Sequence, residues 1–318
     1  MNSNSCELLA VVRRGDWDES LHFGIAALLD PSGTVVQSIG ASAEPILPRS
    51  TLKPMFAATM LQLGLECSDQ QLALVAASNS RSSFHIRIAE GFATALGLEE
   101  SDLGCPPMAP RAGGEPRKFA HMCVGKHIAM ASTARTFESD LDKLDPEHPL
   151  QQRLLADLEV VCGEQSTGTT IDGCGAPVHG LSLEALGRGF WSLGTRNPDL
   201  DEQHADALLR VGAAMRGNPE VVQGEGLPDT VISQRTGSIV KFGAEAVFAV
   251  VAPDGATAVC KIADGGTRAA PLVALTLLEQ HGSLPEGTVE SMCKELGLEV
   301  LGGTEVIGAI EARLPLLS

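Results

Sequence analysis

The sequence predicts an α+β fold in which a mainly antiparallel sheet is covered by helices. Two observations lead to this prediction: β-type runs lie toward both ends of the chain, and segments with helical spacing of apolar residues lie between them. This order favours strands that pair across the two ends in one sheet, rather than a regular alternation of strand and helix. A single domain over residues 1–318 is therefore expected.

The first elements are expected to form an antiparallel β unit. The runs ELLAVV (7–12) and HFGIAALLD (22–30) are separated by the charged segment RRGDWDES. The turn sequence DPSG then leads into TVVQSIG (34–40). Toward the other end, AVFAVVA and ATAVCKI flank the residues PDG within 246–262, which predicts a hairpin.

Helices are expected in the middle of the chain. Apolar residues recur at helical spacing from Ser50 to about Leu98, and Pro54 is tolerated inside the first turn of a helix that begins near Ser50. Residues 104–117 are rich in Pro and Gly, which predicts a loop. Further helices are expected at 149–161, 181–193, 201–215, 268–280 and 286–296.

Composition excludes several classes of function. A net charge of −17 argues against nucleic acid or an anionic membrane surface as the main partner, because phosphate binding needs clustered Lys and Arg. No run approaches the roughly 20 apolar residues of a membrane span, and Met1–Asn4 carry no basic region of a secretory signal. With scattered cysteines and no C-x-x-C, a cytoplasmic location with reduced thiols is expected. The absence of tyrosine excludes a Ser-Lys-Tyr triad.

The segment PRSTLKP (48–54) holds the first candidate pair for catalysis. Ser50 and Lys53 are three positions apart, a spacing that puts hydroxyl and amine on one face of a helix. A lysine beside a serine in a dry site can take the hydroxyl proton. The alternative is a serine helix cap followed by a solvated lysine. The same spacing recurs at Ser238–Lys241, in a β-rich run, and at Ser291–Lys294, in an acidic helix.

Three further constellations qualify as candidates. Ser78 follows an apolar helix in AASNS (76–80), where small residues can also simply end the helix. Lys261 lies in an apolar strand, a costly place for a charge unless it reaches a polar pocket or marks an exposed edge. Two segments, MCVGKH (122–127) and DGCGAP (172–177), carry thiols and a lysine, which are either metal ligands or buried, unmodified cysteines.

The order of these parts indicates serine acyl transfer on an amide. A first S-x-x-K, a Ser/Asn segment and a late strand lysine appear in the order of penicillin-recognising serine enzymes, which carry S-x-x-K, S-D-N and K-T-G.

The same residues resemble the class 3, or asparaginase II-type, L-asparaginases. The likeness begins at RRGDWDESLHFG and continues through PRSTLKP, ALVAASNS, CVGKHIAM, DPEHPLQQ, DGCGAP, NPEVVQGEG and VKFGAEAVFAV to CKIADGG, so it covers nearly the whole chain. The resemblance implies a fold like that of serine β-lactamases and glutaminases. It also implies hydrolysis of the side-chain amide of L-asparagine to L-aspartate and ammonia, in a homodimeric cytoplasmic enzyme.

Carried over to this sequence, the resemblance implies two Ser-Lys tandems, a substrate site and a zinc site. The tandems are Ser50 with Lys53 and Ser78 with Lys261; Arg49, Ser80 and Asp172 are expected at the substrate; Cys123, Lys126 and Cys174 are expected to hold a zinc ion that the proposed chemistry does not require. Ser50 is preferred as the nucleophile because its lysine is local, although the residues leave open which tandem supplies it.

Several positions depart from the family pattern. Asn79 and Ser82 stand where the family has a histidine and an acid in S-H-S-x-E, and Ala263 replaces the acid of K-I-E-D-G. Two alternatives to the L-asparaginase follow: a related amidase for another small amide, or a family member that binds an amino acid or a metal without turnover.

Overall fold

The computed structural model describes residues 5–316. Residues 1–4 and 317–318 of the expected domain lie outside the described residues. The expectation that the chain has no secretory signal depends partly on residues 1–4. The chain divides into two compact units that interleave in sequence. The sheet unit takes the described parts of Met1–Thr51, Leu181–Trp191 and Gly226–Ser318, and the helical unit takes Leu52–Gly180 and Ser192–Glu225. The single catalytic domain over 1–318 stays a prediction.

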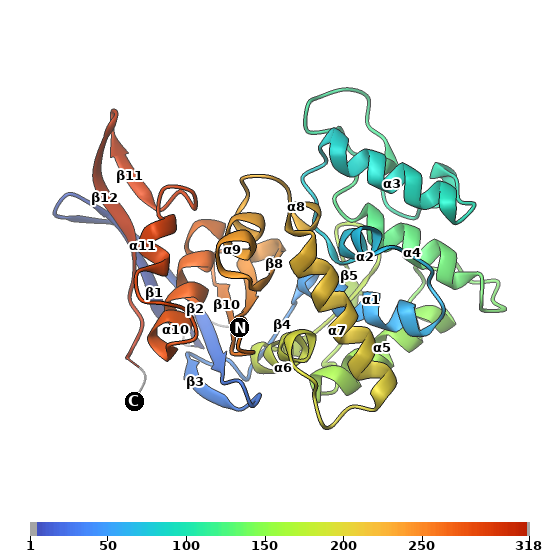
Figure 1. Ribbon diagram of the computed structural model, residues 1–318, viewed down its shortest axis with the longest axis horizontal. Coiled ribbons are helices and arrows are strands. Elements are labelled where there is room, and N and C mark those ends of the chain that lie inside the picture. The colour runs from blue at the N-terminus through green and yellow to red at the C-terminus, as the bar shows by residue number, and fades with distance from the viewer. Residues whose placement is uncertain (1–4, 317–318) are drawn as a thin grey trace. The chain divides into compact units, whose positions relative to one another are not determined.

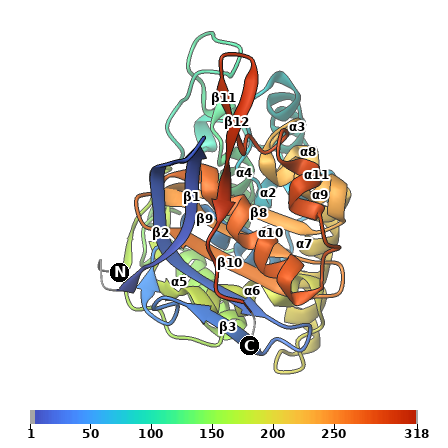
Figure 2. The same cartoon turned by 90° about the vertical axis from the view of Figure 1, so that its left-hand side faces the viewer.

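The sheet unit is built on an antiparallel sheet with the strand order β11-β12-β1-β2-β10-β9-β8, and β3 also pairs with β2 (Figure 2). Segments from the two ends of the chain meet where β2 pairs with β10, as the sequence predicts. The strands are β1 (Glu7–Arg14), β2 (Trp17–Leu29), β3 (Val35–Ile39), β8 (Ile239–Gly243), β9 (Val247–Val251), β10 (Thr257–Ile262), β11 (Glu299–Gly302) and β12 (Glu305–Ala312).

Helix α10 (Ala270–His281) packs on one face of this sheet (Figure 1). Its apolar side chains join alternate residues of the strands in one buried core, to which Leu28, Phe248 and Leu275 belong. On α6 (Leu183–Gly194), an added Cβ at Gly187 would lie 2.6 Å from a methyl of Leu29, so glycine lets this helix approach the sheet. The unit also contains α9 (Pro228–Thr236), α11 (Thr288–Met292) and the short pair β4 (Pro45–Ile46) with β7 (Leu181–Ser182).

Two strand segments differ from the expectation. The charged segment expected to separate the first two strands is itself part of them, because Arg13 pairs with Asp18 and Arg14 with Glu19 across the hairpin. The hairpin of β11 and β12 is not predicted by the sequence, since β11 has only four residues and both strands contain glycine and leave much of their surface exposed.

The helical unit packs its helices around α2 (Asp69–Ala76), whose Leu72–Ala76 are fully buried. Its other elements are α1 (Lys53–Gln62), α3 (Ser83–Ala95), α4 (Val124–Ala134), α5 (Pro149–Cys162), α7 (Glu202–Gly217), α8 (Pro219–Val222) and the strand pair β5 (Thr169–Ile171) with β6 (Pro177–His179). Helices α1, α3, α5 and α7 of this unit and α6 and α10 of the other confirm helical segments expected from the spacing. The helix expected over 286–296 is wrong in its extent, because only α11 (Thr288–Met292) is helical there and turns follow it. Within residues 5–316, no helix combines the length and the apolar character needed to cross a membrane.

Candidate active site

Ser50 lies in a tight turn that leads into helix α1. The 3₁₀ turn spans Arg49–Leu52, and Thr51 closes it by donating both its N–H and its hydroxyl to the Pro48 carbonyl, at 3.3 and 2.7 Å. Ser50 is buried, and the N-cap residue of α1 is Leu52. Ser50 is therefore not the cap of this helix, which removes the commoner explanation for the residue.

Lys53 is the first residue of α1 and is fully buried. Its ammonium donates to the Ala77 carbonyl and, over 3.2 Å, to the Ser78 hydroxyl. Lys53 and Ser78 thus form a Ser-Lys contact inside the helical unit. Ser50 belongs to the sheet unit, so the expected pairing of Ser50 with Lys53 stays a prediction.

The segment after α2 is held by backbone contacts on both sides. The Ser78 N–H donates to the Val222 carbonyl, and the Asn79 side-chain amide donates to the Met122 carbonyl at 3.1 Å. Ser80 packs against Gly224, where an added Cβ would lie 2.5 Å from the Ser80 hydroxyl. Asn79, which departs from the family pattern, therefore serves to attach this segment to the chain before α4.

Two thiols and a lysine converge in the helical unit. The Lys126 ammonium lies 3.3 Å from Cys174 Sγ, and all three side chains are buried. A hydrogen bond from Cys174, together with the charges of Lys53 and Lys126, lowers the pKa of Cys123 well below its ordinary value. Burial opposes the charge on Lys126, but Cys174, Cys123 and Asp172 together raise its pKa. The surroundings thus favour the charged forms of Cys123 and Lys126, whereas the hydrogen bond with Cys123 and burial raise the pKa of Cys174.

Asp172 lies at the start of the turn that carries Cys174. Its carboxylate accepts from the Gly173 N–H at 2.7 Å, and its carbonyl accepts from the Gly175 N–H at 2.8 Å. This turn fixes the Asp172 carboxylate and the Cys174 thiol relative to each other, as the motif DGCGAP requires.

The three predicted zinc ligands fit part of a zinc site. Sulfur and nitrogen ligands in a tetrahedral zinc site lie about 3.6 Å apart, given the usual Zn–S and Zn–N lengths. The 3.3 Å between Lys126 Nζ and Cys174 Sγ is near this value. Among residues 5–316, no group of three or more His, Cys, Asp or Glu side chains is arranged to hold a metal ion. A metal here would therefore need the neutral Lys126 amine as its third ligand.

Lys261 lies on β10 of the sheet unit and is half-buried. Its ammonium donates to the Glu245 carbonyl at 2.6 Å and to the Ile262 carbonyl at 3.1 Å. Burial lowers its pKa, against the charges of Glu245 and Asp264, which raise it. Ser78 lies in the other unit, so the second expected tandem also stays a prediction.

Lys241 is a candidate that the sequence reasoning passed over. It is fully buried on β8, and its charge counteracts the burial that raises the pKa of the equally buried Asp229. Two residues on, Gly243 lies so close to the turn of Ser50 that an added Cβ would be 2.9 Å from the Pro48 carbonyl. The signal was present: Lys241 is a lysine in an apolar strand, as Lys261 is.

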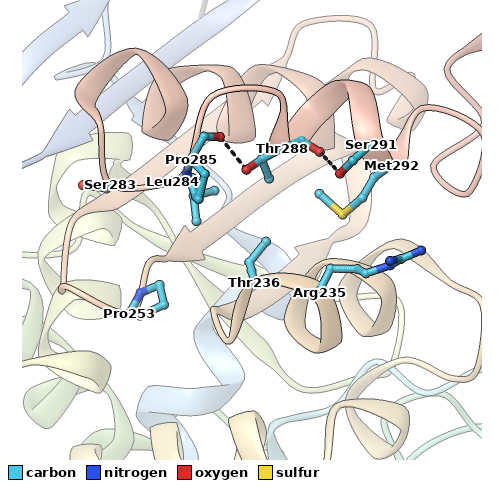
Figure 3. A pocket seen from close by; sticks show the side chains of 9 residues that line it. All are labelled: Arg235, Thr236, Pro253, Ser283, Leu284, Pro285, Thr288, Ser291 and Met292. Carbon is cyan, nitrogen blue, oxygen red and sulfur yellow. Dashed lines mark hydrogen bonds between the residues drawn. The ribbon is translucent and has the colours of Figure 1, made fainter.

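The other serines with S-x-x-K spacing have structural roles. Ser291 lines an exposed cavity of about 300 Å³ and donates to the Thr288 carbonyl in its own helix (Figure 3). Lys294 is exposed. The Ser238 hydroxyl bonds that of Thr236 at 2.7 Å. Of the three serines with this spacing, Ser50 is therefore the best candidate for catalysis, because it is buried and follows a strained residue.

Backbone strain is concentrated at the candidate segments. Within the described chain, the non-glycine residues with positive φ are Arg49 (58°), Arg81 (61°), Glu245 (61°) and Ala246 (55°). Arg49 precedes Ser50, Arg81 follows Ser80, and Glu245 holds the Lys261 ammonium. Strained backbone of this kind is characteristic of functional sites, because it persists only where the surrounding structure imposes it.

Comparison with known proteins gives one family and one fold. A family model described as L-asparaginase II matches residues 10–312. No curated protein sequence matches this chain.

Among solved structures, Mglu in its native form aligns with a TM-score of 0.50 at 13% identity, covering 84% of this chain and 66% of that one. Mglu in its glutamate form gives 0.48 at 14% identity, covering 82% and 61%. A mutant of the Streptomyces K15 DD-transpeptidase gives 0.43 at 14% identity, covering 82% and 97%. The chain thus spans about two thirds of the length of Mglu, and native Mglu shares its fold.

Proposed function

The chain belongs to the L-asparaginase II family, and from this premise we propose that it hydrolyses the side-chain amide of L-asparagine to L-aspartate and ammonia. The family match over residues 10–312 carries the proposal of the reaction. The buried contact between Lys53 and Ser78 and the strained turn before Ser50 support a Ser-Lys mechanism.

In the proposed mechanism a serine attacks the carboxamide carbon. A neutral lysine takes the hydroxyl proton, the amide nitrogen leaves as ammonia, and water hydrolyses the β-aspartyl ester. We assign the attack to Ser50 and the proton transfer to Lys53, with Ser78 as the relay that Lys53 contacts. Lys261 is the second lysine expected from the resemblance, and we add Lys241 because its strand packs against the turn of Ser50.

The remaining residues are assigned to the substrate. Arg49 and Ser80 are proposed to bind its α-carboxylate and neighbouring polar groups, and the Asp172 carboxylate its α-ammonium, since opposite charges favour these pairings. A homodimer and a cytoplasmic location, which the resemblance implies, belong to the same proposal.

Cys123, Lys126 and Cys174 are the residues that would hold zinc. When bound, the ion would supply a fixed positive charge in the helical unit; no step of the mechanism depends on it. Without metal, the Lys126 ammonium supplies positive charge at the same thiols.

The departures near Ser78 favour one alternative, an amidase for another small amide. Asn79 uses its side-chain amide on a backbone carbonyl, and the Ser82 hydroxyl bonds the His85 ring at 2.7 Å. Neither side chain repeats the chemistry of the family's histidine and acid.

A substrate panel tests the proposed function. The purified chain is incubated with L-asparagine, D-asparagine, L-glutamine and simple carboxamides, and ammonia and the acid product are measured together. We expect one mole of aspartate for each mole of ammonia from L-asparagine. Faster turnover of another amide would establish the alternative, and binding of L-asparagine without ammonia would indicate a member that does not turn over substrate.

A further inference from the structure

The turn that follows Lys261 is fastened to the neighbouring strand by one buried histidine. His22 lies on β2, in the run RRGDWDESLHFG, and is 4% exposed. Two residues later, an added Cβ at Gly24 would lie 2.2 Å from the Lys261 carbonyl, so glycine brings β2 and β10 unusually close. The proposed mechanism gives neither residue a part.

The imidazole of His22 connects the two sides of this turn. Its Nε2 accepts from Arg268 Nε at 2.9 Å, which leaves the proton on Nδ1. Nδ1 faces the Asp264 carboxylate at 3.7 Å, and the other oxygen of Asp264 accepts from the Gly266 N–H at 2.7 Å. Arg268 lies after the two glycines and Asp264 before them, so His22 is hydrogen-bonded to one end of the turn, and its Nδ1 lies near the other end without a hydrogen bond.

The same turn, through Gly265, also approaches the segment that binds the Lys261 ammonium. At Gly265, with φ +76°, an added Cβ would lie 2.5 Å from the Glu245 carboxylate. The Glu245 carbonyl accepts from Lys261 at 2.6 Å, and Glu245 itself has a positive φ. A continuous set of contacts therefore runs from His22 through the turn to the strained residue that holds the amine.

We propose that His22 is a positioning residue for Lys261: through Arg268 and Asp264 it fixes the turn and the Glu245 carbonyl, and so the place of the amine. This inference deepens the proposed function and depends on it only for its catalytic readout. A displacement of about 1 Å at a reacting group can cost about a hundredfold in rate, so a residue that fixes such a group affects kcat more than KM.

The role of His22 depends on its neutral form. Two charged groups face His22: Arg268, from the short helical turn Thr267–Ala269, and Asp264. Glu19, which lies on β2 as His22 does, interacts electrostatically with Arg268. Burial lowers the pKa of His22, as does Arg268, while Asp264 raises it. Protonation of Nε2 would replace the acceptor of Arg268 with a second donor, and the contact would break.

The test compares His22→Gln with His22→Leu, and uses His281→Gln as the control, since the His281 ring bonds Ser283 at the end of α10. A glutamine oxygen can still accept from Arg268, whereas leucine cannot. We expect His22→Leu to lower kcat by about tenfold or more with little change in KM, and His22→Gln to keep most of the activity. The acid limb of the kcat profile should move to lower pH in His22→Gln, because this acceptor no longer titrates.

Equal losses in both variants with the wild-type pH profile would overturn the proposal and leave His22 a structural residue. An unchanged kcat in His22→Leu would also overturn it. Hydrogen exchange of the Gly266 amide separates this outcome from a failure of the proposed function, because it needs no turnover. If wild type releases no ammonia, faster exchange in His22→Leu but not in His22→Gln still supports the positioning role, and unchanged exchange contradicts it.

Discussion

The residue before Ser50 separates backbone strain from side-chain chemistry. Arg49 holds a φ of +58°, a conformation that glycine adopts freely and other residues adopt at a cost of about 1–2 kcal/mol. We predict that both Arg49→Gly and Arg49→Ala lower activity, since both remove the guanidinium. Arg49→Ala should be less stable than Arg49→Gly by about 1 kcal/mol. Urea unfolding measures the difference, and equal stability of the two variants would contradict strain at this position.

The buried pair on β8 and α9 gives a second prediction. Removing one of two opposite buried charges leaves the other charge uncompensated and lowers the free energy of unfolding by about 3–5 kcal/mol. Lys241→Met should therefore destabilise strongly, because Asp229 is equally buried and the Lys241 charge acts to lower the Asp229 pKa against the effect of burial. Adding Asp229→Asn should recover part of the loss, and a double variant no more stable than Lys241→Met would show that the two residues do not interact. The half-buried Lys261→Met is the comparison, with a smaller expected loss.

At the scale of elements, one glycine sets the approach of α4 to α2. An added Cβ at Gly125 would lie 2.1 Å from the Leu74 carbonyl, which is backbone and cannot turn aside. Gly125→Ala is predicted to cost about 1–3 kcal/mol by overpacking. Because α2 leads directly into Ala77 and Ser78, which the Lys53 ammonium contacts, ammonia release should fall as well.

Gly91 on α3 provides the matched control for that substitution. It is exposed in the middle of a helix, and an added Cβ meets no atom within 4 Å. Gly91→Ala should stabilise by about 0.5–1 kcal/mol, because alanine is the better helix former. A loss at Gly91 similar to that at Gly125 would mean that the close approach is not the cause.

At the scale of the whole molecule, the buried histidines of the helical unit govern stability against acid. Burial lowers the pKa of His121, His127 and His179 to about 4 in each case. Between the ordinary value of about 6.5 and this value, the unfolded chain binds protons that the folded chain does not. Stability should therefore be complete above about pH 6.5 and fall as the pH falls toward 4.

His179→Gln tests this pH dependence. The His179 ring bonds Thr169 at 2.9 Å and lies edge-on to Phe56. The variant should lose the contribution of one proton to the slope of unfolding free energy against pH. An unchanged slope would contradict the assignment of this residue as a buried neutral histidine.

Much of the architecture was predictable, because apolar periodicity reports which face of an element is buried. Strands β9 and β10 and helices α5 and α7 lie where their spacing predicts. The β11–β12 hairpin was not predictable, since its strands are mostly exposed and show no regular alternation of buried and exposed residues. The hairpin at Arg13–Glu19 was obscured by charges that pair across strands, and these pairs cannot be identified from spacing alone.

The candidate site was predictable in its residue types and less so in its pairings. Spacing indicates that Ser50 and Lys53 are close in sequence, but it does not show that Lys53 reaches Ser78, 25 positions away. It also gave no preference for Lys241, because the closeness of Gly243 to Pro48 depends on the tertiary fold. Contacts of this kind arise from how elements pack, which a single sequence does not record.

The most direct test is ammonia release from L-asparagine by wild type beside Ser50→Ala and Lys53→Ala, with circular dichroism to confirm folding. We predict turnover by wild type and a loss of about a hundredfold or more in both variants, because Ser50 forms the ester and Lys53 takes its proton. Full activity in a folded Ser50→Ala, or no turnover by wild type, would contradict a Ser50-Lys53 asparaginase.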